Sequence, residues 1–90
     1  MGTFYKALLR DKDDNIIRRM YGTRLCDVEE IVKIWTNELM KDGCEMDETI
    51  DHNNNGDWFR NIFFFKGVEM ISIHINNYSY IENGSFYDME

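Results

Sequence analysis

The fold is decided by the stretch DVEEIVKIWTNELMKD, residues 27 to 42, which reads as the clearest amphipathic helix of the chain. Its larger apolar residues recur at the spacing that the buried face of a helix requires. They are Val28, Ile31, Val32, Trp35 and Leu39. Because a helix with one apolar face must pack that face against another layer, the rest of the chain is expected to supply a sheet.

Both ends of this helix carry sequence signals. Asp27 and Glu30 have the spacing of a capping box, so Asp27 is predicted to be the N-cap residue and to accept a hydrogen bond from the Glu30 amide. Gly43 follows the last helical residue and is predicted to adopt the left-handed conformation that commonly ends helices. The helix is therefore expected to span residues 27 to 42.

Before the helix, the sequence predicts a β-hairpin. Residues 3–10 alternate between the two faces of a strand and are followed by the polar turn 11–15. Residues 16–21 read as the returning strand. Ile16 and Ile17 are adjacent, so the alternation leaves open which face of the hairpin is buried.

After the helix, residues 44–50 alternate weakly and predict a short strand. Residues 58–65 and 68–75 predict a second hairpin around Lys66-Gly67, because glycine permits the positive φ of a tight turn. The dipeptide Asn83-Gly84 is a strong signal for a type I′ turn. It predicts a third, short hairpin from residues 78–81 and 85–89.

Together these segments predict a single α+β domain. Its core is an antiparallel sheet of roughly four to six strands with one amphipathic helix on one face. The expected order is ββα(β)ββ(β), in which the strands in parentheses have the weaker signals. One helix covers only one face of such a sheet, so the opposite face is expected to be open to solvent or to a partner.

Acidic residues dominate the chain and are concentrated in its later part. The whole sequence has 17 Asp and Glu against 10 Lys and Arg, a formal net charge of −7. Residues 1–24 hold six basic and three acidic side chains, whereas residues 25–90 hold four basic and 14 acidic ones. This charge disfavours direct binding to nucleic acids and anionic membranes, and it favours binding to basic protein surfaces.

The function expected from this charge is that of a stoichiometric protein-binding module on a basic, nucleic-acid-binding surface of a larger protein. Carboxylates along the helix and the segment after it would imitate phosphate groups. In size and charge the chain resembles small acidic inhibitors made by phages and mobile elements, of the anti-CRISPR and anti-restriction types. The residues predicted to bind the partner are Glu29, Glu30, Glu38, Asp42, Glu45, Asp47 and Glu48.

The alternative function is a small-ligand or cation-binding accessory domain built on the stretch DHNNNGD, residues 51–57. Its first six residues match the first half of an EF-hand calcium loop, which uses alternate oxygen ligands and a glycine for the sharp turn. The match ends there, because Ile62 stands where the loop needs glutamate, and a plain hairpin loop fits the same residues. The predicted ligands are Asp51, Asn53, Asn55 and Asp57, with His74 as a further polar group.

Enzymatic activity and a bound cofactor are not expected. The two histidines, His52 and His74, fit no metal-binding spacing, and no phosphate-binding loop or nucleophile motif is present. Cys26 and Cys44 lie at opposite ends of the predicted helix, too far apart for a disulfide, and are expected to be reduced. Without an apolar run of signal-peptide or membrane-span length, the expected location is the cytoplasm.

A homodimer is compatible with either function. The apolar strand 68–75, expected at an edge of the sheet, is an aggregation hazard unless it is covered. The open sheet face, expected to carry His74 and either Arg18 or Arg19, is a second surface through which two copies would associate.

Overall fold

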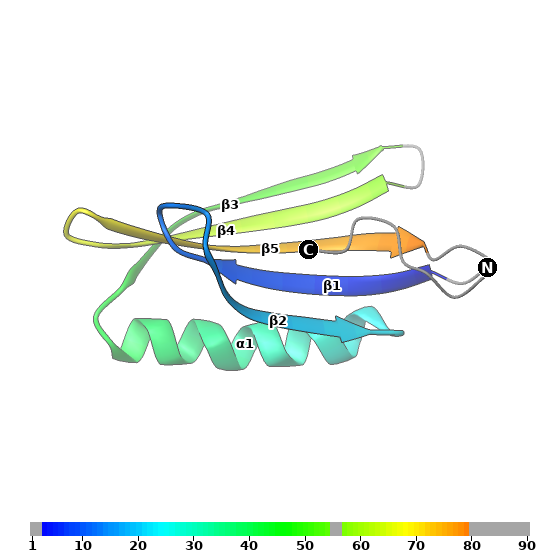
Figure 1. Ribbon diagram of the computed structural model, residues 1–90, viewed down its shortest axis with the longest axis horizontal. Coiled ribbons are helices and arrows are strands. Elements are labelled where there is room, and N and C mark those ends of the chain that lie inside the picture. The colour runs from blue at the N-terminus through cyan, green and yellow to red at the C-terminus, as the bar shows by residue number, and fades with distance from the viewer. Residues whose placement is uncertain (1–2, 55–56, 80–90) are drawn as a thin grey trace.

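The computed structural model describes residues 3–54 and 57–79, and Figure 1 shows the arrangement of their elements. The described strands are β1 (Thr3–Arg10), β2 (Ile16–Gly22), β3 (Glu45–Asn54), β4 (Asp57–Lys66) and β5 (Glu69–Ser79). The helix α1 (Leu25–Lys41) lies between β2 and β3 in the sequence. The predicted α+β class, with one helix packed on an antiparallel sheet, is confirmed.

The five described strands form one antiparallel sheet in the order β2-β1-β5-β4-β3. The first hairpin joins the second through β1 and β5, where Ala7 is paired with Ile75. β5 is therefore central, and the prediction that the strand 68–75 lies at an edge is wrong. β5 also continues to Ser79, whereas the rest of the predicted third hairpin lies outside the described residues.

The core lies between α1 and one face of the sheet. The helix packs mainly on β1 and β2, and in Figure 1 most of β3 runs along the margin of the sheet farther from α1. Each fully buried large apolar side chain stabilises the fold by roughly 1.5–3 kcal/mol. The buried residues of this cluster are Ala7, Leu9, Val28, Val32, Trp35, Cys44, Ile62, Phe64, Ile73 and Ile75.

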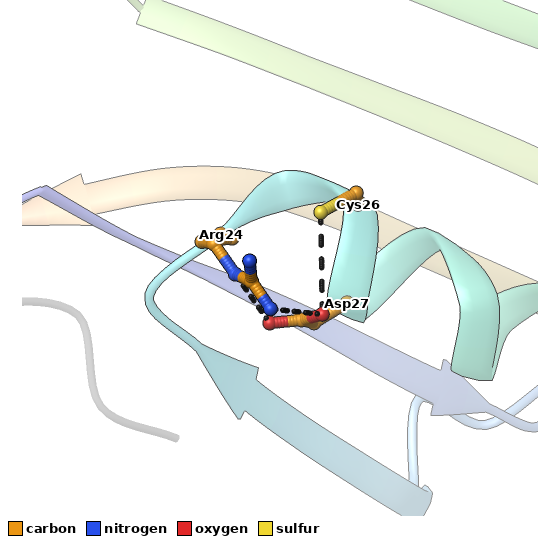
Figure 2. A network of polar contacts seen from close by, with 3 residues as sticks. All are labelled: Arg24, Cys26 and Asp27. Carbon is orange, nitrogen blue, oxygen red and sulfur yellow. Dashed lines mark hydrogen bonds and ion pairs between the residues drawn. The ribbon is translucent and has the colours of Figure 1, made fainter.

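The helix begins two residues earlier than predicted, and the predicted capping box is wrong. Arg24 is the N-cap residue, and no side chain caps the helix there. Asp27 lies inside the first turn, where its carboxylate accepts two hydrogen bonds from the Arg24 guanidinium at 3.0 and 3.1 Å (Figure 2). The physical reason for the earlier start is Leu25, whose apolar side chain packs against the core as part of the helix.

The C-terminal end of α1 confirms the prediction for Gly43, which has φ of +93°. The Gly43 amide donates to the carbonyl oxygen of Met40 at 3.1 Å, and the Cys44 amide donates to that of Leu39 at 3.0 Å. These two bonds form a Schellman motif, which satisfies carbonyl groups at the helix end. Cys44 is buried beneath the motif, whereas Cys26 at the other end of the helix is exposed.

β3 is longer than the sequence suggests, and the turn between β4 and β5 lies one residue later than predicted. β3 continues to Asn54, which is paired with Asp57 of β4, so most of the stretch 51–57 is strand instead of loop. Pairing with a neighbouring strand has overridden the weak strand propensity of these polar residues. Between β4 and β5, the turn consists of Gly67 and Val68, and the φ of +62° at Gly67 fits a type II′ turn.

Candidate protein-binding surface

Four of the predicted partner-binding acids belong to α1 or its C-cap, and two of the four are engaged within the protein. Oε2 of Glu38 lies 2.8 Å from Nη1 of Arg18 on β2. Glu29 pairs with an arginine of β4, as described below. Glu30 and the C-cap residue Asp42 are exposed and form no ion pair with another described residue. The helix therefore contributes fewer available carboxylates than the sequence predicts.

Arg60 of β4 is the residue that sequence reasoning missed. Its Nε donates to Oδ1 of Asp51 at 2.8 Å, and its Nη1 donates to Oε2 of Glu29 at 3.2 Å. The hydrogen bond to Asp51, with the nearby charges of both carboxylates, raises the pKa of Arg60 above its ordinary value. One guanidinium thus links α1, β3 and β4, and it pairs with two of the predicted site residues.

Three of the acids without an internal partner lie where α1 ends and β3 begins. Asp42, Glu45 and Asp47 are exposed, and the structure gives them no ion pair with another described residue. We call these three residues the junction acids. The nearby carbonyl end of α1 adds a partial negative charge of about half an elementary charge. Negative potential is therefore concentrated at this junction.

Two lysines lie close to the junction, Lys41 in the last turn of α1 and Lys66 of β4. Cε of Lys66 is 3.7 Å from the position that a Cβ atom on Gly43 would take. Lys66 lies at the end of β4, and no ion pair joins it to a junction acid. The local balance of charge around the junction therefore remains negative.

β3 is an edge strand of the sheet, and a bulge interrupts its beginning. Glu45 and Met46 are paired with β4, the register then shifts at Asp47, and pairing resumes with Glu48 opposite Phe63. Bulges of this kind bend a strand and turn one residue out of the ladder. Asp47 is consequently presented at the surface, as its exposure confirms.

Among the four predicted cation ligands, the structure describes the side chain of Asp51 alone. Asp51 and Asn53 belong to β3, Asp57 begins β4, and Asn55 lies outside the described residues. Asp51 is engaged by Arg60, as described above. Among residues 3–54 and 57–79, no group of three or more His, Cys, Asp and Glu side chains has the arrangement of a metal site. The cation site remains a prediction.

The sheet face opposite α1 carries a row of rings that crosses three strands. His52 of β3 stacks on Phe59 of β4 with ring centroids 4.8 Å apart, and Phe59 lies 5.7 Å from His74 of β5. Nδ1 of His74 is 2.6 Å from Oδ1 of Asn61, so Nδ1 carries the proton in this contact. The pairing of Leu8 with both Arg19 and His74 places Arg19 on this face, whereas Arg18 faces α1.

Three hollows in the described surface are small. The hollow between α1 and β4, lined by Glu29, Val32 and Arg60 among others, has a volume of about 190 Å³. The other two have volumes of about 250 and 160 Å³. Pockets for small ligands typically enclose roughly 300–1,000 Å³. Each of these three hollows is smaller than that range.

Comparisons with models of protein families, with curated proteins and with solved structures gave no match. Within the described residues, no helix is long and apolar enough to cross a membrane.

Proposed function

We propose that this protein is a small stoichiometric binding module that places its junction acids against a basic surface of a larger cytoplasmic protein. The observation that carries the proposal concerns Asp42, Glu45 and Asp47. These acids lie close together in the sequence, are exposed, and form no ion pair with another described residue. A carboxylate that is already paired with arginine gains little from a second cation, whereas these three retain their full charge for a partner.

The rest of the charge distribution supports the same function. A net charge of −7 attracts a basic surface over distances of about a Debye length, roughly 8 Å at physiological salt. Such steering accelerates association, while the close contacts determine how long the complex lasts. The expected basic surface is one that normally binds nucleic-acid phosphates, because closely spaced carboxylates can occupy the same cationic groups.

The internal ion pairs have a different role in this proposal. Glu38 with Arg18, and Glu29 with Arg60, hold α1 against β2 and β4. They support the position of the junction without contacting the partner. The proposed surface is therefore smaller than the set of acids predicted from the sequence.

A pair of matched variants tests the proposal. Glu45→Lys with Asp47→Lys reverses two junction acids, and Asp13→Lys with Glu69→Lys reverses two exposed acids elsewhere. Both variants change the net charge equally. We expect the parent protein and the second variant to retain the same partner from host lysate at low salt. We expect the first variant to bind that partner at least about tenfold more weakly, which corresponds to about 1.4 kcal/mol of binding free energy.

Two outcomes would count against the proposed function. Equal loss in both variants would mean that net charge alone drives capture. Retention by both variants, or retention by the parent that withstands high salt, would mean that the junction acids are not the contact. Addition of heparin, a polyanion, is expected to displace the partner from the parent protein.

A further inference from the structure

Among the described residues, β3 forms one edge of the sheet, and its outer backbone groups are paired with no described strand. In the part of the chain that the structure describes, β3 is paired only with β4, from Glu45 opposite Phe65 to Asn54 opposite Asp57. β3 is ten residues long, and Figure 1 shows it at the margin of the sheet, away from α1. The outer side of an edge strand presents amide and carbonyl groups that can pair with another chain.

The opposite edge of the sheet is a weaker candidate. β2 is seven residues long, and α1 packs beside it. The ion pair between Arg18 and Glu38 connects β2 directly to the helix. A helix that covers a sheet margin hinders the approach of another strand. The longer and less covered edge is therefore that of β3.

The side chains of β3 specify the charge of a strand that would pair with it. β3 contains Glu45, Asp47, Glu48 and Asp51 and no lysine or arginine, and of these acids Asp51 is already paired with Arg60 of β4. A second copy of β3 paired with the first would bring acids of one copy close to acids of the other, which destabilises strand pairing. A strand with lysine or arginine would instead gain favourable cross-strand pairs. Charge complementarity thus favours a basic partner segment over a homodimer through this edge.

Exposed apolar side chains on β3 offer a second kind of contact. The Met46 and Ile50 side chains are 44% and 45% exposed. An added strand would cover part of this surface with its own side chains. The bulge at Asp47 interrupts the ladder, so the continuous part of the edge runs from Glu48 to Asn54.

We propose that this edge, from Glu48 to Asn54, binds an extended basic segment of the partner by strand addition. This inference rests on the proposed function and specifies how the partner is held. Main-chain hydrogen bonds would supply the attachment, and the junction acids with Glu48 would select a basic sequence. The acids of the edge disfavour pairing with a second acidic copy but not with a basic segment. The bulge lies before Glu48 and so outside the proposed binding edge.

A defined peptide pair tests strand addition apart from charge. The first peptide has eight residues of alternating lysine and valine, and the second has the same sequence with every backbone amide N-methylated. Both carry the same charge, but only the first can donate backbone hydrogen bonds. We expect the full-length protein to bind the first peptide at least about tenfold more tightly by fluorescence anisotropy, about 1.4 kcal/mol.

Variants of the protein locate the binding site of the peptide. Thr49→Lys places a cation on the exposed β3 edge, and Val68→Lys places one in the exposed turn between β4 and β5. We expect Thr49→Lys to weaken binding of the unmethylated peptide at least about fivefold, which is a loss of about 1 kcal/mol of binding free energy. We expect Val68→Lys to lose less than about 0.5 kcal/mol.

The outcomes separate this inference from the proposed function. Equal binding of both peptides would overturn strand addition, while the matched charge variants could still support the junction acids. Failure to bind either peptide would also overturn it. If Thr49→Lys and Val68→Lys weaken binding equally, the edge of β3 is not the attachment point. Circular dichroism of each variant confirms that the loss is not caused by unfolding.

Discussion

Arg60 shows how one side chain can occupy two carboxylates that the sequence presents as available for binding. It holds Glu29 and Asp51 at hydrogen-bond distance, and its own side chain is 30% exposed. Ion pairs at this level of exposure contribute about 0.2–1 kcal/mol each, so their main effect here is to occupy carboxylates and join three elements. The proposed surface consists of the acids at the end of α1 and the start of β3, which no arginine reaches.

Asp11 is a residue whose ionisation supports the turn between β1 and β2. Its Oδ1 accepts hydrogen bonds from the amides of Asn15 at 3.0 Å and Asp13 at 2.9 Å. These bonds, with that of the Asn15 amide the strongest cause, hold the pKa of Asp11 below its ordinary value of 3.8. The folded protein therefore favours the ionised form. The resulting stability is complete above the unfolded pKa and is lost as pH falls through the lower folded pKa.

The Asp11→Asn substitution tests this linkage. We expect Asp11→Asn to be less stable than the parent at about pH 7, and the difference to shrink as pH falls below the ordinary pKa of Asp11. Urea unfolding across the range from neutral pH to about pH 2 measures both effects. Asp13→Asn is the control, because its exposed side chain makes no hydrogen bond with another described residue. A stability difference that does not change with pH would contradict the assignment.

The helix ends show what a local sequence pattern can and cannot predict. The glycine at the C-terminal end was predicted correctly, because only a residue that tolerates positive φ fits the Schellman motif formed there. The capping box at the N-terminal end was wrong, because burial of Leu25 in the core moved the start of α1 to an earlier residue. Tertiary packing determined where the helix begins, and a local sequence pattern does not report tertiary packing.

Gly43 provides a test of the helix end. We expect Gly43→Ala to destabilise the fold by about 1 kcal/mol, because alanine disfavours the left-handed region. A Cβ at Gly43 would meet only Cε of Lys66 at 3.7 Å, so the loss arises from backbone conformation instead of a clash. Gly43→Asn should lose less, since asparagine tolerates positive φ. Thermal unfolding that leaves Gly43→Ala unchanged would contradict this account.

Strand positions were predictable where pairing is local. The strands of the first hairpin were placed within one residue, because alternation and a polar turn define them. β3 was predicted too short, since its polar second half is a strand only through pairing with β4. The central position of β5 depends on β1, far away in the sequence, and no local pattern reports that contact.

The candidate surface was only partly predictable, for a similar reason. The sequence identifies each acid but does not show which ones arginines reach across the fold. Arg18 and Arg60 removed Glu38 and Glu29 from the proposed surface. The ring row of His52, Phe59 and His74 also depends on strand register, which places residues of three strands next to one another. Alternation within each strand shows which residues share a face of that strand. It does not give the register between strands, which decides which rings become neighbours.

Across the whole molecule, the two layers have different roles. The helix and the strands beneath it form the core, while the junction lies at the C-terminal end of α1 and the free edge of β3 runs from there along the margin of the sheet (Figure 1). A partner bound along this margin would leave the core contacts intact. The account therefore predicts that binding and folding stability respond to different sets of substitutions.

Amide hydrogen exchange of the full-length protein, alone and in the complex captured from host lysate, tests the central claim most directly. Groups that pair with a partner exchange more slowly in the complex. We predict slower exchange between residues 42 and 54, which contain the junction acids and β3. Protection confined to β2 or to the sheet face with the ring row, with no change in β3, would contradict the account.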